Sequence, residues 1–174
     1  KEWGMEQFVR DNRINMIYEG TNTIQSLDLL GRKVLGNNGA TLQKFGKLVG
    51  KLVAEEGVNE KMAEFINPIA YLGDQMTKFT TEIGFKGYQN PDEIGAAAVD
   101  YLRVAGHLVF GYFWARMAQT ALREIAAGNT DPFYVAKLQT ARFYFAKLFP
   151  ETATLMRTAR AGSKVLIDTD AALA

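Results

Sequence analysis

The sequence predicts an all-α protein: an antiparallel helical bundle preceded by a short helical arm. Apolar residues recur every three or four positions over long stretches, whereas runs of strict apolar-polar alternation are hard to find. Only 4 prolines occur in 174 residues, and the turn signals are few and far apart. These features are typical of a small number of long helices that pack side by side.

The composition is that of a globular protein. A hydrophobic fraction of 48% with 22% charged residues argues against disorder. The net charge of +1 gives no electrostatic footprint for nucleic acid. The absence of cysteine excludes disulfides, thiolate metal ligands and a cysteine nucleophile. The longest apolar stretch, residues 104–118, is too short to span a bilayer. We therefore expect a soluble protein, cytoplasmic or in the mitochondrial matrix.

The arm should consist of two helices, over residues 5–13 and 23–34. Thr21 is a plausible N-cap for the second helix. The apolar face expected for that helix is Ile24, Leu27 and either Leu30 or Gly31. Gly36-Asn37-Asn38-Gly39 is the strongest turn in the chain and marks the boundary between arm and bundle.

The first half of the bundle should contain two helices. Thr41 is expected to cap a helix that ends near Glu56, with an apolar stripe of Leu42, Phe45, Val49, Leu52 and Val53. A longer helix follows over residues 59–85, and Pro68 predicts a kink or a break in it. Its expected core face is Met62, Phe65, Ile66, Ile69, Leu72, Met76, Phe79 and Ile83.

The next helix should begin near Asn90-Pro91-Asp92 and end near Gly128, a typical C′ glycine. One side carries Leu102, Val109, Phe113, Met117 and Ala121, but Tyr101, Leu108 and Tyr112 are apolar too. A helix that is apolar on nearly all sides is usually the central one of a bundle. We expect its single histidine, His107, to be a hydrogen-bonded core residue, and we predict no metal site.

The last long helix should start at Thr130-Asp131-Pro132. Its recurring apolar residues are Tyr134, Leu138, Ala141, Phe145 and Leu148. Pro150 is expected to interrupt it, and residues 151–161 to resume it. Residues 168–174 are expected to form an unstructured tail.

One motif carries possible chemistry. Glu19 follows an apolar pair and directly precedes Gly20, which is small enough to let a ligand approach the backbone. Taken alone, the tripeptide Glu19-Gly20-Thr21 favours an acid that merely stabilises a helix N-terminus.

A longer match changes that interpretation. Arg10-Asp11-Asn12-Arg13, the run Ile17-Tyr18-Glu19-Gly20-Thr21 and then Ile24-Gln25 together resemble the signature of the acyl-CoA dehydrogenases. Residues from about 41 to 167 resemble the additional helical domain found in one branch of that family. The resemblance implies three parts: the end of the catalytic domain over residues 1–36, the additional bundle over 41–167, and the tail. The chain opens on Lys1-Glu2-Trp3, so we expect a C-terminal piece of a longer flavoenzyme.

The resemblance also implies roles for individual residues. Glu19 would be the base that removes the α-proton of an acyl-CoA, and Gly20 would line the acyl chain. Thr21, Asn22 and Thr23 match positions that contact FAD, although Thr23 departs from family members with a longer polar residue there. The electrons would pass to an electron-transfer flavoprotein, and a homodimer or higher homo-oligomer is implied. The fragment by itself should neither retain FAD nor oxidise acyl-CoA.

Two alternatives stay open. The bundle could be a non-catalytic oligomerisation or docking module in which Glu19 has no chemical role. The parent could also be an acyl-CoA oxidase, which shares the base but passes electrons to oxygen. The sequence does not fix the acyl group, because the walls of the acyl pocket would lie mostly upstream.

Overall fold

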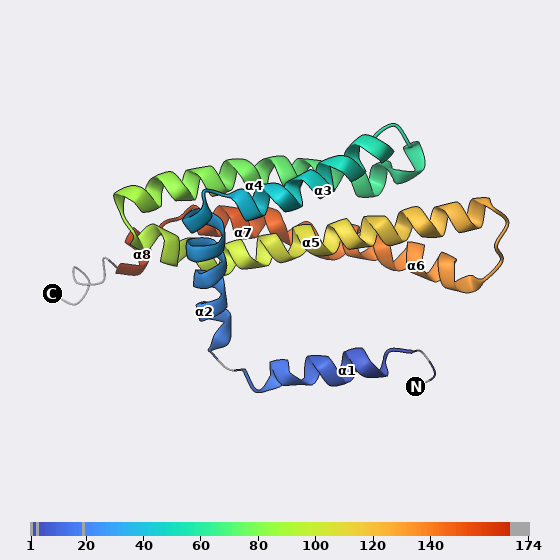
Figure 1. Ribbon diagram of the computed structural model, residues 1–174, viewed down its shortest axis with the longest axis horizontal. Coiled ribbons are helices and arrows are strands. Elements are labelled where there is room, and N and C mark those ends of the chain that lie inside the picture. Colours follow the sequence, from blue (N-terminus) through green and yellow to red (C-terminus); the bar gives the residue numbers. More distant parts are fainter. Residues whose placement is uncertain (1, 3, 19, 168–174) are drawn as a thin grey trace.

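The computed structural model describes residues 2, 4–18 and 20–167. Within this part of the chain all regular structure is helical, which confirms the predicted all-α class. Four long segments run antiparallel along the bundle (Figure 1). They are α3 (Ala40–Glu56), α4 (Ala63–Gln89), α5 (Asp92–Ala126) and the pair α6 (Pro132–Phe143) and α7 (Glu151–Ala159). Among these described residues no helix is long and apolar enough to cross a membrane.

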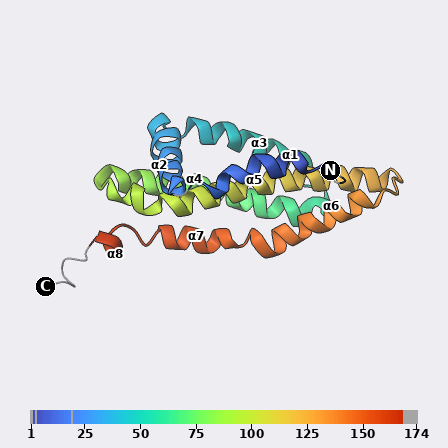
Figure 2. The ribbon, with the colours of Figure 1, turned by 90° about the horizontal axis from the view of Figure 1, so that it is seen from below.

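The shorter elements lie at the two ends of the chain. Helix α1 (Glu6–Asn12) and a 3₁₀ turn (Arg13–Met16) form the arm, and α8 (Lys164–Ile167) follows the bundle. Helix α2 (Thr21–Leu27) continues into a π-helical segment (Asp28–Val34) and a 3₁₀ turn (Leu35–Asn37). Seen at right angles, α3 and α7 lie on opposite sides of the layer that contains α4 and α5 (Figure 2).

Helix α4 has the core face that the sequence predicts. A 3₁₀ turn (Glu60–Met62) leads into it, and the eight predicted residues are all buried. The sequence predicts a kink or a break at Pro68; the break is wrong, because α4 runs unbroken from Ala63 to Gln89. Pro68 lies near the start of the helix, so it removes one early hydrogen bond, while Phe65, Ile66 and Ile69 around it are held in the core.

Helix α5 is the central helix, as expected, because it contacts α2, α4, α6 and α7. The side of α5 that carries Val109, Phe113 and Met117 is mostly exposed, and Ala121 is the buried residue on it. The buried face is instead Tyr101, Val104, Leu108, Tyr112, Ala115 and Ala118. With apolar residues on nearly every side of α5, periodicity could not select the inward face.

The turns fall where the sequence places them, but the expected cap at Thr41 is wrong, because α3 already begins at Ala40. Asn38 and Gly39 both adopt left-handed backbone, with φ of 54° and 75°, and Gly39 is the N-cap of α3. Asp131 caps α6 by accepting a hydrogen bond from the Phe133 amide at 2.9 Å. A π-helical segment (Tyr144–Leu148) precedes Pro150, after which α7 begins. Residues 168–174 lie outside the described part.

Candidate active site

The candidate site lies at the start of α2, where the chain changes direction between the arm and the bundle (Figure 1). Gly20 is the N-cap of α2 and has φ of +74°, a conformation that L side chains rarely adopt. Apart from Gly20 and its two chain neighbours, no described atom lies within 4 Å of the position that a Cβ on Gly20 would occupy. Glu19, the predicted base, lies outside the described residues. The structure therefore places its neighbour Gly20 in the kind of turn that the sequence suggests.

Thr21, Asn22 and Thr23 form the first turn of α2. The prediction that Thr21 caps this helix is wrong: Thr21 is its first residue, and its hydroxyl donates to the Tyr18 carbonyl at 3.0 Å. Asn22 and Thr23 are exposed, and their side chains make no hydrogen bond to the described residues. These two side chains are available to a ligand or to another part of a larger protein.

The face by which α2 is held differs from the predicted one. Ser26, Leu30 and Val34 are buried, at spacings of four residues, whereas Ile24 is 60% exposed and Leu27 is 39% exposed. The Ser26 hydroxyl donates to the Thr23 carbonyl at 2.7 Å, so its burial leaves no polar group unsatisfied. Helix α2 crosses the bundle steeply rather than lying along it, and it contacts α5 (Figure 1).

An ion-pair cluster follows directly in the π-helical segment. The Asp28 carboxylate contacts Arg32 at 2.6 Å and Lys33 at 2.8 Å. The hydrogen bond from Lys33, together with the charges of Arg32 and Lys33, lowers the pKa of Asp28. The wider turn of a π-helix suits a contact between residues five apart, so Lys33 can share the carboxylate with Arg32. This cluster fixes the segment that carries Leu30 into the core.

The arm in front of the site is uncovered. No residue of α1 is buried, and the arm stands away from the bundle (Figure 1). Its large apolar residues are 45% to 77% exposed: Met5, Phe8, Val9, Ile14, Met16, Ile17 and Tyr18. An arm with so much uncovered apolar surface is typical of a segment that packs against another body.

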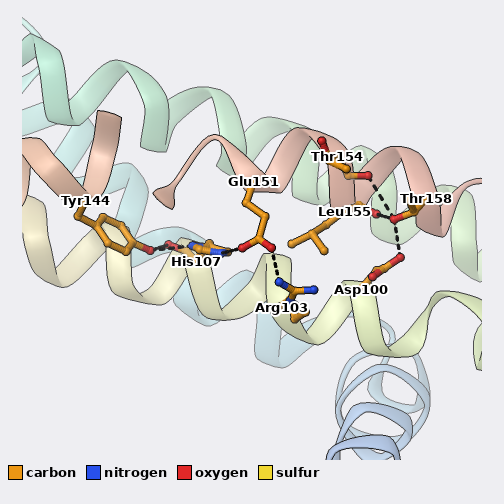
Figure 3. A network of polar contacts seen from close by, with 8 residues as sticks. All are labelled: Asp100, Arg103, His107, Tyr144, Glu151, Thr154, Leu155 and Thr158. Carbon is orange, nitrogen blue, oxygen red and sulfur yellow. Dashed lines mark hydrogen bonds and ion pairs between the residues drawn. The ribbon is translucent and has the colours of Figure 1, made fainter. Parts of the chain in front are cut away.

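A second polar cluster joins α5 to α7, and the sequence analysis did not find it. Glu151 pairs with Arg103, and its other oxygen lies 3.1 Å from Nε2 of His107 (Figure 3). Nδ1 of His107 lies 3.0 Å from the Tyr144 hydroxyl. Burial raises the pKa of Tyr144 to about 12, so this hydroxyl is protonated at neutral pH. The prediction that His107 is hydrogen-bonded is confirmed.

The geometry of this cluster is structural rather than catalytic. The Thr158 hydroxyl extends it by donating to Asp100 at 2.6 Å, one helical turn from Arg103 (Figure 3). Each member has a partner on a neighbouring element. The spacing of Arg103 and His107 places both on one face of α5, but Glu151 is distant in sequence, so only the packed structure reveals the cluster. Among the described residues no three His, Asp or Glu side chains gather as a metal site would require.

Comparison with known proteins agrees with the helical architecture. The family described as "Acetyl-CoA dehydrogenase C-terminal like" matches residues 41–170. The 3-methylmercaptopropionyl-CoA dehydrogenase of Ruegeria pomeroyi is 34% identical over 155 residues, which cover 87% of this chain and 26% of that protein.

Two further relatives are more distant. The broad-specificity linear acyl-CoA dehydrogenase FadE5 of Mycobacterium tuberculosis is 24% identical over 86% of this chain and 26% of its own length. A butyryl-CoA dehydrogenase of Syntrophomonas wolfei is 24% identical over 97% of this chain and 28% of its length. The chain thus spans about a quarter of the length of these relatives. It belongs to the acetyl-CoA dehydrogenase C-terminal-like family.

Proposed function

We propose that this chain is the C-terminal part of a flavin-dependent acyl-CoA dehydrogenase in which Glu19 is the catalytic base. The observation that carries the proposal is the similarity to three acyl-CoA dehydrogenases, each of which matches 86% to 97% of this chain. Residues 1–36, which include the arm and α2, would complete the catalytic domain, and residues 41–167 would form the additional helical domain.

Glu19 would accept the α-proton of the acyl-CoA thioester as the trans double bond forms between the α- and β-carbons. Bound FAD would supply the acceptor for the hydride that leaves the β-carbon. A carboxylate beside an apolar acyl chain is a stronger base than one in water, because burial destabilises its charge. The left-handed turn at Gly20 supports this role, since a residue without a side chain lets the substrate pass close to the backbone.

The start of α2 fits a contact with FAD. Asn22 and Thr23 expose polar side chains that no described residue engages, and amide and hydroxyl groups suit the phosphates and hydroxyls of a nucleotide. Thr21 fits less freely, because its hydroxyl already donates to the Tyr18 carbonyl. We therefore assign the cofactor contact mainly to Asn22 and Thr23, with Thr21 shaping the turn.

The exposed arm supports a larger assembly. Seven large apolar side chains of the arm lie uncovered, and in the proposed enzyme they would pack against the remainder of the catalytic domain. Acyl-CoA would be the substrate, an electron-transfer flavoprotein the electron acceptor, and a homo-oligomer the working form.

The decisive experiment uses Glu19→Gln in the protein expressed from the complete reading frame. We expect turnover of acyl-CoA to fall by at least about 10²-fold, because a general base contributes about 10²–10⁴-fold. The flavin content should stay unchanged. Glu6→Gln is a matched control in the same arm, because Glu6 is partly exposed and, among the described residues, pairs with Arg10. Full activity of Glu19→Gln would contradict the proposal and favour a docking module.

A further inference from the structure

A groove between α5 and α6 combines aromatic rings with unpaired positive charge. It has a volume of about 430 Å³, which lies within the range of small-molecule sites. It is lined by Tyr112, Phe113, Arg116, Met117, Thr120, Ala121, Phe133, Tyr134 and Lys137. We call this the α5–α6 groove. Its lining residues belong to α5 and α6 and to no part of α2, so the groove is separate from the candidate active site.

Two phenylalanine rings of the groove are about half exposed. Phe113 and Phe133 are each 55% exposed. Behind them, Tyr112 packs edge-on against Phe113 at 5.4 Å between ring centroids, and Tyr134 packs edge-on against Phe133 at 5.5 Å. Each phenylalanine thus contacts a neighbouring tyrosine and is still about half exposed. A flat ring of a ligand could stack on such a surface.

The cations of the groove lack acidic partners. Arg116 donates to the Tyr112 hydroxyl at 3.2 Å, and Lys137 lies 5.2 Å from the centre of the Phe133 ring. No carboxylate lines the groove, and neither cation forms an ion pair with a described residue. Elsewhere in the bundle the interhelical arginines are neutralised, as Arg142 is by Glu64 at 2.9 Å. Two uncompensated cations beside aromatic rings complement an anion such as phosphate.

We propose that the α5–α6 groove binds a purine nucleotide. The base would stack against Phe113 and Phe133, and the phosphates would meet Arg116 and Lys137. Two ligands carry such a purine and its phosphates: a free nucleotide and coenzyme A, through its nucleotide end. The inference rests on the lining of the groove alone and is independent of the role of Glu19.

Calorimetric titration of the 174-residue chain with ADP tests the proposal. Adenosine, inorganic phosphate, decanoate and coenzyme A are titrated in parallel. We expect ADP to bind more tightly than adenosine or phosphate, because only ADP engages both the rings and the cations. Coenzyme A binding at least about tenfold tighter than ADP would identify its nucleotide end as the source, and equal affinities would identify a free nucleotide. Either result supports the proposal.

Substitutions distinguish specific ADP binding in the groove from non-specific attraction to surface charge. Arg116→Gln and Phe133→Leu should each weaken ADP binding about tenfold, the effect of losing one charged hydrogen bond or one stacking contact. Arg123→Gln on α5 and Lys147→Gln after α6 are matched controls outside the groove and should leave binding unchanged. Circular dichroism verifies that each variant keeps its helices.

Three results would overturn the proposal. ADP could bind no better than phosphate or adenosine, which would show that rings and cations do not act together. The two control variants could weaken binding as much as Arg116→Gln, which would show non-specific attraction. Decanoate could bind more tightly than ADP, which would make the groove a site for an amphipathic acid.

Discussion

Two glycines of α5 differ in how closely a neighbouring side chain approaches them. At Gly111 an added Cβ would lie 2.7 Å from Cε2 of Phe149, a buried ring, whereas at Gly95 it would meet nothing within 4 Å. Gly111 therefore marks a close approach between α5 and the segment before α7.

The expected effects of alanine at these two positions have opposite signs. Gly111→Ala should destabilise the fold, because overpacking costs about 1–3 kcal/mol and the better helix propensity of alanine returns at most about 1 kcal/mol. Gly95→Ala should stabilise it by up to about 1 kcal/mol for the same propensity reason. Urea unfolding of both variants measures the difference. Equal changes of one sign would show that α5 and Phe149 do not pack as described.

A partly buried contact at Glu93 predicts how stability depends on pH. Its carboxylate accepts hydrogen bonds from the Ser163 hydroxyl at 2.5 Å and the Ser163 amide at 2.9 Å. These bonds, the hydroxyl bond first, lower the pKa of Glu93 below its ordinary value of 4.5. Because the folded pKa is the lower one, the stabilisation is present above pH 4.5 and is lost as the pH falls through the folded pKa.

As the pH falls below neutral, the free energy of unfolding of Glu93→Gln should therefore decrease less steeply than that of the wild-type protein. The wild-type protein loses this contribution below pH 4.5, whereas the variant has no carboxylate to protonate there. Urea unfolding at several pH values between neutral and acid measures both curves. Lys51 and Glu55 are 3.7 Å apart and exposed, so Glu55→Gln serves as a control with little effect. Identical acid limbs for wild type and Glu93→Gln would contradict the account.

At the scale of elements, the sequence predicts some faces well and others poorly. The core face of α4 follows from its clear separation of apolar and polar positions, and all eight predicted residues are buried. For α5 and α2 the apolar residues occupy more than one side, so the inward face depends on where neighbouring helices lie. The predicted face of α2 included Leu30 correctly but also Ile24, which is exposed.

The attachment of α2 gives an element-scale prediction. Leu30 is fully buried in the core, and truncating a leucine at such a site costs about 2–5 kcal/mol. Leu30→Ala should therefore lower the free energy of unfolding by about that amount. Ile24→Ala, on the exposed side of the same helix, should change it by about 0.5 kcal/mol or less. A larger loss at Ile24 than at Leu30 would mean that α2 presents its other face to α5.

At the scale of the whole molecule, local signals give the architecture but not the functional surfaces. The helix class and turns follow from periodicity and from residues such as Gly39 and Asp131. The cluster of Arg103, His107 and Glu151 and the α5–α6 groove require helices far apart in sequence to meet. The candidate site at Glu19 and Gly20 depends on resemblance, because three or four residues at a turn do not specify a reaction by themselves.

The uncovered arm connects the bundle to the proposed enzyme. Its exposed apolar residues are expected to pack against the remainder of the catalytic domain, and that packing would place Gly20 and the start of α2 beside FAD and acyl-CoA. The 174-residue chain alone should accordingly show no flavin absorbance. A yellow preparation of this chain that oxidises acyl-CoA would contradict this division of labour.

Visible absorbance of the protein from the complete reading frame, recorded without oxygen before and after acyl-CoA is added, tests whether Glu19 is the catalytic base. We predict a flavin band that bleaches in the wild-type protein. In Glu19→Gln the same band should be present but should not bleach on the same timescale, because the α-proton has no base to receive it. No flavin band in the wild-type protein, or equally rapid bleaching in Glu19→Gln, would contradict the account.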